Sequence, residues 1–148
     1  MQTDTEAPRQ EALGVLANAQ MKDLTSAWDT WVNRPEVETI RGPETGLIML
    51  RGRTGGGGTP FNLGEATVTR ASVRIDSGEI GHGYCLGRDT DKARLIAVID
   101  ALFQREPSNI EFAILRPLRD VACARERRQR DEAAATRVDF FTVVRGED

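Results

Sequence analysis

Arginine side chains are the groups in this sequence best suited to binding a charged ligand. Arg70 and Arg74 lie in ATVTRASVRID, a stretch with a period of two that places both arginines on the same face of a strand. The planar guanidinium of arginine binds phosphate and carboxylate groups through paired hydrogen bonds. Two interpretations stay open: a ligand or partner contacts these arginines, or they face solvent and pair with Glu65 or Glu79.

The only histidine, His82, lies in the strand pattern IGHGYCLG that follows. A single histidine excludes a multi-histidine metal site within one chain. If residues 77–78 form a two-residue hairpin loop, Val73 pairs with His82, and the histidine faces the core together with Ile80 and Tyr84. The glycines of the second strand then lie beside the arginines. This register favours a core histidine, with a ligand-binding histidine as the alternative.

A further candidate, Arg88, stands where this strand gives way to a helix. A helix N-terminus can hold an anion, but Asp89 or Thr90 is expected to take that place as the cap. No nucleophile with a recognisable base and no metal-ligand cluster accompanies these side chains. The sequence therefore predicts no catalytic residue and no metal site, and it gives four candidates for binding a ligand or a partner: Arg70, Arg74, His82 and Arg88.

A run of four glycines lies in RTGGGGTPFNLGE, residues 53–65. A phosphate-binding P-loop needs a Gly-Lys-Ser/Thr ending that opens a helix, whereas this run ends in Thr-Pro-Phe and a strand pattern follows. Glycine between two strands serves as a flexible connector. We therefore expect a flexible loop over residues 53–60, and the alternative is a backbone surface that contacts a ligand or partner.

Length and composition indicate one globular domain over residues 1–148, with residues 1–7 disordered. A formal net charge of −3 gives no reason to expect nucleic acid or an anionic membrane as a partner. The sequence shows no apolar signal region and no membrane-spanning run, which favours the cytoplasm. The two cysteines, Cys85 and Cys123, lack metal-ligand spacing and are expected as buried or half-buried thiols.

Hydrophobic periodicity predicts an α+β fold, an antiparallel meander with N-terminal, central and C-terminal helices. A turn at Gly42–Pro43 is expected to separate the first two strands. The helices are predicted at residues 8–19, 21–33, 87–106 and 118–137, and the strands at 36–42, 45–53, 66–76, 80–87, 110–115 and 138–146.

Aromatic residues give the candidates for a subunit interface. Trp28 and Trp31 are neighbours on a predicted helix face, where they serve either the core or a partner protein. The C-terminal strand VDFFTVVRG is apolar on both faces, so it needs a second cover. A partner chain is favoured over the N-terminal helices as that cover, and the isolated chain can dimerise through it. The interface candidates in this strand are Phe140, Phe141, Val144 and Arg145.

The sequence as a whole resembles a known family. The stretch PFNLGEATVTRASVRIDSGEIGHGYCLGRD, the helix end IDALFQ, the C-terminal RVDFFTVVRG and the earlier ETGLIML follow one another as in the PhnG subunit of the bacterial carbon–phosphorus lyase system. The resemblance covers nearly the whole chain. The four-glycine run is longer than the family pattern leads us to expect.

The resemblance implies a role in phosphonate breakdown. PhnG joins the PhnH, PhnI and PhnJ subunits in a core assembly. With PhnH, PhnI and an ATP-binding-cassette-like partner, it supports replacement of the adenine of ATP by a phosphonate, which gives a ribose 1-phosphonate 5-triphosphate. PhnI looks like the nucleosidase of that scheme, so the resemblance implies a chain that is inactive alone and holds no cofactor, ATP being a substrate of the complex.

Two other function classes stay open on the residues. The chain could be a self-sufficient enzyme or binding domain for a small anion, using Arg70, Arg74, Arg88 and His82. It could also be a purely structural assembly subunit that never contacts a substrate.

Overall fold

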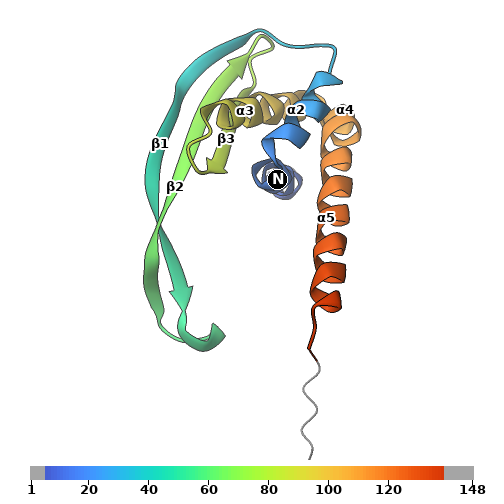
Figure 1. Ribbon diagram of the computed structural model, residues 1–148. Helices are drawn as coiled ribbons and strands as arrows, with labels where there is room; N and C mark the ends of the chain where they lie inside the picture. Colours follow the sequence, from blue (N-terminus) through green and yellow to red (C-terminus); the bar gives the residue numbers. More distant parts are fainter. Residues whose placement is uncertain (1–5, 139–148) are drawn as a thin grey trace, which may run out of the picture.

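Three antiparallel strands in the order β1–β2–β3 form the sheet of this protein (Figure 1). The computed structural model describes residues 6–138. The strands are β1 (Val37–Arg53), β2 (Pro60–Ile75) and β3 (Ile80–Leu86). The helices are α1 (Glu6–Asn18), α2 (Met21–Asp29), α3 (Thr90–Arg105), α4 (Pro107–Ile110) and α5 (Arg116–Ala135). This is the predicted α+β arrangement with an antiparallel sheet.

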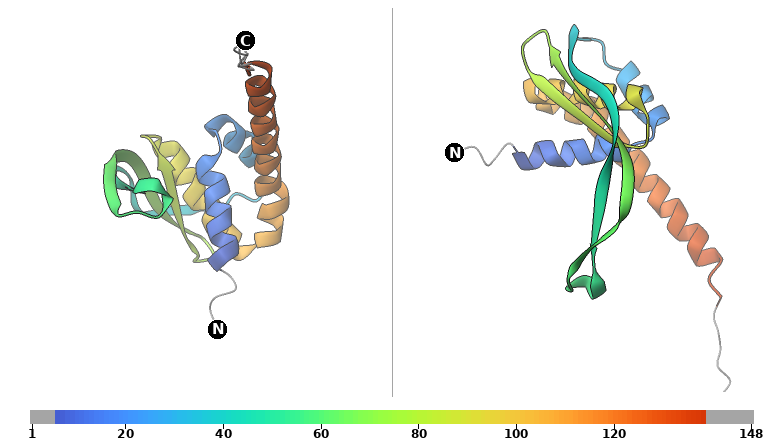
Figure 2. Two further views of the ribbon diagram at one scale, coloured as in Figure 1. Left: turned by 90° about the horizontal axis from the view of Figure 1, so that it is seen from below. Right: turned by 90° about the vertical axis from the view of Figure 1, so that its left-hand side faces the viewer.

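Helix α3 forms the centre of the core, against one face of β2 and β3. As predicted, Asp89 caps its start: the carboxylate accepts a hydrogen bond from the Lys92 backbone N–H at 2.9 Å. Helix α1 lies between the sheet and α5, as Figure 1 and the left view of Figure 2 show. The largest fully buried apolar side chains come from α1, α2, α3, residues 110–115 and β2. They include Leu16, Leu24, Val73, Ile96, Ile99, Leu102, Ile114 and Leu115.

The backbone of β3 lies directly against α3. Gly81 and Gly83 face the helix so closely that a Cβ atom at either position would meet α3 backbone, 1.9 Å from the Ala97 carbonyl oxygen and 1.8 Å from the Ala93 carbonyl oxygen respectively. The helix side of this contact is also small, because Ala93, Ala97 and Ala101 recur every four residues. A strand approached this closely by another backbone has room only for glycine.

The β2–β3 register differs by one residue from the predicted one. Ser72, not Val73, pairs with His82, while Arg74 pairs with Ile80 and Arg70 with Tyr84. The connection is a three-residue loop, in which Gly78 adopts a φ of +101° and the Ile75 N–H bonds to the Glu79 carbonyl at 3.0 Å. The predictions that His82 faces the core and that glycines flank the arginines are therefore wrong.

Two other strand predictions are wrong. Strand β1 runs through Gly42–Pro43 without a turn and absorbs these residues as an irregularity in its pairing with β2. Residues 110–115 are helical, because Ile110, Ile114 and Leu115 are spaced to bury one helix face. A single π-helical turn, Glu111–Leu115, joins α4 to α5 just before Pro117, which has no N–H to continue the regular ladder.

The distal part of the β1–β2 hairpin extends beyond the rest of the sheet (Figures 1 and 2). Strand β3 pairs with β2 only from Val68 to Arg74, so residues 46–64 have no third strand beside them. The glycine run lies at the hairpin tip, where Thr54–Gly56 form a short 3-10 turn and the Gly58 N–H bonds to the Thr54 carbonyl at 2.8 Å. The expected loop is thus a hairpin turn, and its flexibility stays a prediction.

One buried carboxylate connects α1, α3 and β3. Asp100 in α3 is 1% exposed and accepts two hydrogen bonds from the Arg9 guanidinium, at 2.9 and 2.7 Å. It also accepts the His82 backbone N–H at 2.8 Å. One turn further along α3, the Gln104 side chain donates to the Ile80 carbonyl at 2.7 Å. A buried carboxylate is tolerated because these donors replace its hydration.

The tryptophans and cysteines lie in different surroundings. Trp28 and Trp31 are half-buried and pack against the core, although Trp31 lies beyond the end of α2. Cys85 is buried, and burial raises the pKa of its thiol. Cys123 is exposed on α5, so the expectation of a buried or half-buried thiol is wrong there. Among the described residues, no helix is both long and apolar enough to span a bilayer.

Candidate functional site

A half-open hollow of about 570 Å³ separates α1 from β2 and β3. Its volume falls within the range of small-ligand sites. Helix α1 supplies an apolar wall, in which Gly14 contributes no side chain. The strands supply a polar wall that includes two arginines, a serine, a histidine and a tyrosine. The lining residues are Leu13, Gly14, Ala17, Arg41, Arg70, Ala71, Ser72, His82, Gly83 and Tyr84.

The charged side of the hollow is built around Glu44. Its carboxylate oxygen Oε1 accepts from Arg70 Nε at 2.6 Å and from Arg41 Nε at 2.7 Å. The hydrogen bond from Arg70 is the main cause that lowers the pKa of Glu44, and the charge of Arg41 adds to it. Two arginines share one carboxylate, so the cluster keeps a net positive charge and the terminal guanidinium nitrogens face a ligand or solvent.

The other polar groups of the hollow follow from the observed register. His82 Nδ1 lies 2.8 Å from Ser72 Oγ, across the strand pair. Asp100 bonds to the backbone of His82 and not to its ring, so this serine–histidine pair lacks the carboxylate that orients the base in a catalytic triad. Tyr84 is cross-strand from Arg70 and half-exposed. The arrangement suits binding of an anionic group beside an apolar wall.

The structure brings only two of the four predicted binding residues, Arg70 and His82, to this hollow. Arg74 is on the same strand face but pairs with Glu38 at 3.2 Å, and Arg88 is exposed in the turn after β3. Trp28 lies in α2 and Trp31 just beyond its end, and neither lines the hollow. The interface candidates Phe140, Phe141, Val144 and Arg145 lie outside the described residues.

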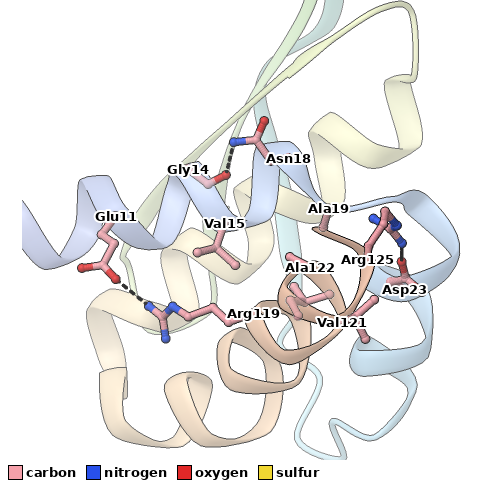
Figure 3. Close-up of a pocket in the computed structure, with 11 residues that line it drawn as sticks. Glu11, Gly14, Val15, Asn18, Ala19, Asp23, Arg119, Val121, Ala122 and Arg125 are labelled. Carbon is pink, nitrogen blue, oxygen red and sulfur yellow. Dashed lines mark hydrogen bonds and ion pairs between the residues drawn. The ribbon is translucent and has the colours of Figure 1, made fainter. Parts of the chain in front are cut away.

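A second hollow, of about 440 Å³, lies between α1 and α5 (Figure 3). Its centre is apolar, with Val15, Ala19 and Val121 among the side chains that face it. An ion pair stands at each end. Arg119 bonds to Glu11 at 3.1 Å, and Arg125 bonds to Asp23 at 2.8 Å. Both carboxylates are thereby satisfied within the chain, so this groove offers apolar contact without free charge.

Comparison with known proteins places the chain in a family. The family model described as phosphonate metabolism protein PhnG matches residues 7–146. The chain belongs to the PhnG family. A curated relative from Rhizobium meliloti (strain 1021), described as alpha-D-ribose 1-methylphosphonate 5-triphosphate synthase subunit PhnG, is 54% identical over 146 residues. The match covers 96% of this chain and 92% of that relative. The resemblance seen in the sequence is confirmed.

Sequence reasoning missed three polar members of the hollow of this PhnG-family chain: Arg41, Ser72 and Tyr84. Arg41 comes from a stretch predicted to end at a turn, so its position beside Arg70 had no signal. For Ser72 and Tyr84, the sequence does contain a signal. The alanines spaced by four in α3 and the alternate glycines of β3 could have identified the two surfaces that meet, and that contact fixes the register.

Replacing Glu44 with glutamine tests whether the hollow of this PhnG-family protein binds anions. The neutral amide leaves both arginines uncompensated, so pyrophosphate affinity should rise about 5-fold. Isothermal titration calorimetry at low salt measures it. For the unaltered chain, affinity should rise only once the pH falls below the lowered pKa of Glu44 and its carboxylate is protonated.

The matched control is Glu38→Gln, which frees Arg74 outside this hollow in the same way. Equal affinities for the two variants would show that the hollow gives no advantage over an ordinary surface arginine.

Proposed function

We propose that this PhnG-family chain is a subunit of an enzyme that makes alpha-D-ribose 1-methylphosphonate 5-triphosphate during phosphonate breakdown. One observation carries the proposal: the 54% identity to a curated subunit of that synthase extends over 96% of this chain and 92% of the relative. In the proposed reaction an alkylphosphonate replaces the adenine of ATP at the ribose.

The proposed role is that of a supporting, non-catalytic subunit in the cytoplasm. PhnH-, PhnI- and PhnJ-like subunits and an ATP-binding-cassette-like protein are its proposed partners, and the chain itself is proposed to hold no cofactor. The residues of the hollow support this role, because they are suited to binding and the serine–histidine pair is not oriented by a carboxylate. ATP enters as a substrate of the assembled complex.

Reconstitution of the synthase tests the proposal. Adenine release from ATP in the presence of methylphosphonate should require this chain together with the other synthase subunits, and the pure chain alone should release none. Liquid chromatography of the reaction mixture measures both adenine and the ribose product. Product formation at an equal rate without this chain would contradict the proposal, and so would adenine release that follows the pure chain through purification.

A second candidate, binding of a small anion by the isolated chain, is favoured by one observation. Arg41 and Arg70 line a hollow of ligand size and share a single carboxylate. The calorimetric comparison of the Glu44 and Glu38 variants tests it without any other subunit. Arg74 and Arg88, expected from the sequence to join this surface, are not part of the hollow.

A further inference from the structure

The distal β1–β2 hairpin, residues 46–64, exposes an unusual amount of apolar surface. We call this segment the arm. It has strand pairing only within itself, since β3 ends its contact with β2 at Val68. A two-stranded hairpin is at best marginally stable in water without a further layer. The large apolar side chains exposed on the arm are Leu47 at 65%, Met49 at 56%, Leu50 at 42%, Phe61 at 45% and Leu63 at 62%.

These side chains occupy both faces of the arm. Successive residues of a strand point to opposite faces, so Leu47 and Met49 lie opposite to Leu50. Phe61 and Leu63 share the face of Gly52, because a Cβ atom at Gly52 would lie 3.5 Å from Phe61 Cζ and 2.7 Å from Leu63 Cδ1. Ile48, Leu50, Phe61 and Leu63 thus form one apolar face. A flat partner surface would cover only one of the two faces, whereas a crevice would cover both.

On the second face, Leu47 and Met49 give way to cationic residues toward the tip, and the exposed Glu65 lies cross-strand from Met49 at the base of the arm. Arg51 and Arg53 continue the alternation of Leu47 and Met49, and neither guanidinium bonds to another side chain in the described part of the protein. The arm contains no acidic residue, although the whole chain carries a formal net charge of −3. Paired or solvated arginines are common on protein surfaces. Here two arginines without a partner follow the apolar Leu47 and Met49, so a complementary surface would be apolar first and carry carboxylates at its end.

We propose that the arm inserts into a crevice on another subunit of the synthase. One wall of that crevice is apolar against Leu50, Phe61 and Leu63. The other wall is apolar against Leu47 and Met49 and acidic where Arg51 and Arg53 arrive. The inference rests on the proposed function, which supplies the other subunits, and it names the surface by which this chain joins them.

A second copy of this chain fits the arm less well. Its apolar groove between α1 and α5 is closed at both ends by ion pairs, in which Glu11 and Asp23 already have arginine partners (Figure 3). Insertion of an arm there would bring further arginines to carboxylates that are already neutralised. Because this groove offers no unpaired carboxylate, we assign the acidic end that Arg51 and Arg53 require to a different protein.

Assembly of the full-length chain with the other synthase subunits provides the test. The variant Leu50→Ser/Leu63→Ser removes the apolar face, and Arg51→Glu/Arg53→Glu reverses the charge of the tip. Each is expected to weaken co-assembly at least ~30-fold, as for central contacts of an interface. The charge-reversal effect should shrink at high salt, whereas the apolar effect should persist. Analytical size-exclusion chromatography with light scattering and surface plasmon resonance measure both.

The control variants are Val32→Ser and Phe112→Ser, which remove large apolar side chains, 90% and 69% exposed, from positions outside the arm. They should assemble as the unaltered chain does. Circular dichroism melting of each isolated variant verifies that it folds, and the arm substitutions should leave the melting temperature within a few degrees because they touch no core residue.

Each outcome decides the inference. Loss of assembly in the two arm variants alone supports it. Normal assembly of the arm variants overturns it and leaves the proposed function intact. Dimers of the isolated chain that the arm variants abolish would overturn the choice of partner in favour of a second copy. If the unaltered chain neither joins the other subunits nor supports product formation, the proposed function fails as well.

Discussion

Replacing Gly83 with alanine is expected to destabilise the protein by roughly 3 kcal/mol or more. The new methyl group would lie 1.8 Å from the Ala93 carbonyl oxygen and 2.7 Å from the Ala97 backbone N. Both are main-chain atoms of α3, so relief requires the whole helix to move away from β3. The separation would loosen the contact of Cys85 and Val73 with the helix, which is why the cost should exceed that of an ordinary overpacked core position.

Urea unfolding of the Gly83→Ala variant measures this cost. Gly46→Ala is the matched control, because Gly46 is also a strand glycine but no atom lies within 4 Å of a Cβ added there. The control should be neutral or slightly stabilising. If Gly83→Ala unfolds within about 1 kcal/mol of the unaltered chain, the close approach of β3 to α3 does not govern stability.

Replacing Arg9 with methionine is the second change expected to have a large effect, a loss of about 2–3 kcal/mol. Removal of one partner from a buried ion pair costs roughly 3–5 kcal/mol, because the other charge is left without compensation. Here the expected value is lower, since Arg9 is 31% exposed and water can replace part of its hydrogen bonding to Asp100. Asp100 itself is 1% exposed, so that replacement is incomplete.

The control for Arg9→Met is Arg34→Met. Arg34 pairs with Asp29 at 3.2 Å, but both side chains are more than half exposed. Such a pair is worth about 0–1 kcal/mol. Thermal and urea unfolding of the two variants should therefore separate clearly, and equal losses would show that the Arg9–Asp100 contact contributes no more than a surface pair.

The sequence was sufficient for the fold class and for α3, since the apolar stripe and the Asp89 cap are local signals. The sequence did not predict the correct register between β2 and β3. The turn residues allow either a two- or a three-residue loop, and the choice depends on the contact between alternate glycines and α3, which is a tertiary effect. The segment 110–115 is helical and not the predicted strand, and the two prolines that flank it, Pro107 and Pro117, both stand in first turns of helices.

The candidate site was predictable only in part. Arg70 was identified from the alternation of β2, and His82 was identified with the wrong orientation. Arg41 reaches the hollow because β1 continues through Gly42–Pro43. The apolar wall comes from α1, more than forty residues earlier in the chain than β2. Local sequence periodicity predicts neither the position of Arg41 nor the packing of α1 beside β2. The sequence did not predict the arm either. Its length depends on β1 continuing as one strand from Val37 to Arg53.

The bonds that α3 makes to β3 determine where the sheet can grow. The His82 N–H donates to the Asp100 carboxylate, and the Ile80 carbonyl accepts from the Gln104 side chain. Neither of these backbone groups takes part in pairing with β2. An incoming strand would find these two groups already bonded, so β3 is blocked as an edge strand over Ile80–His82. Strand addition by a partner, or by a misassembled copy, is thereby favoured at β1, the opposite edge of the sheet.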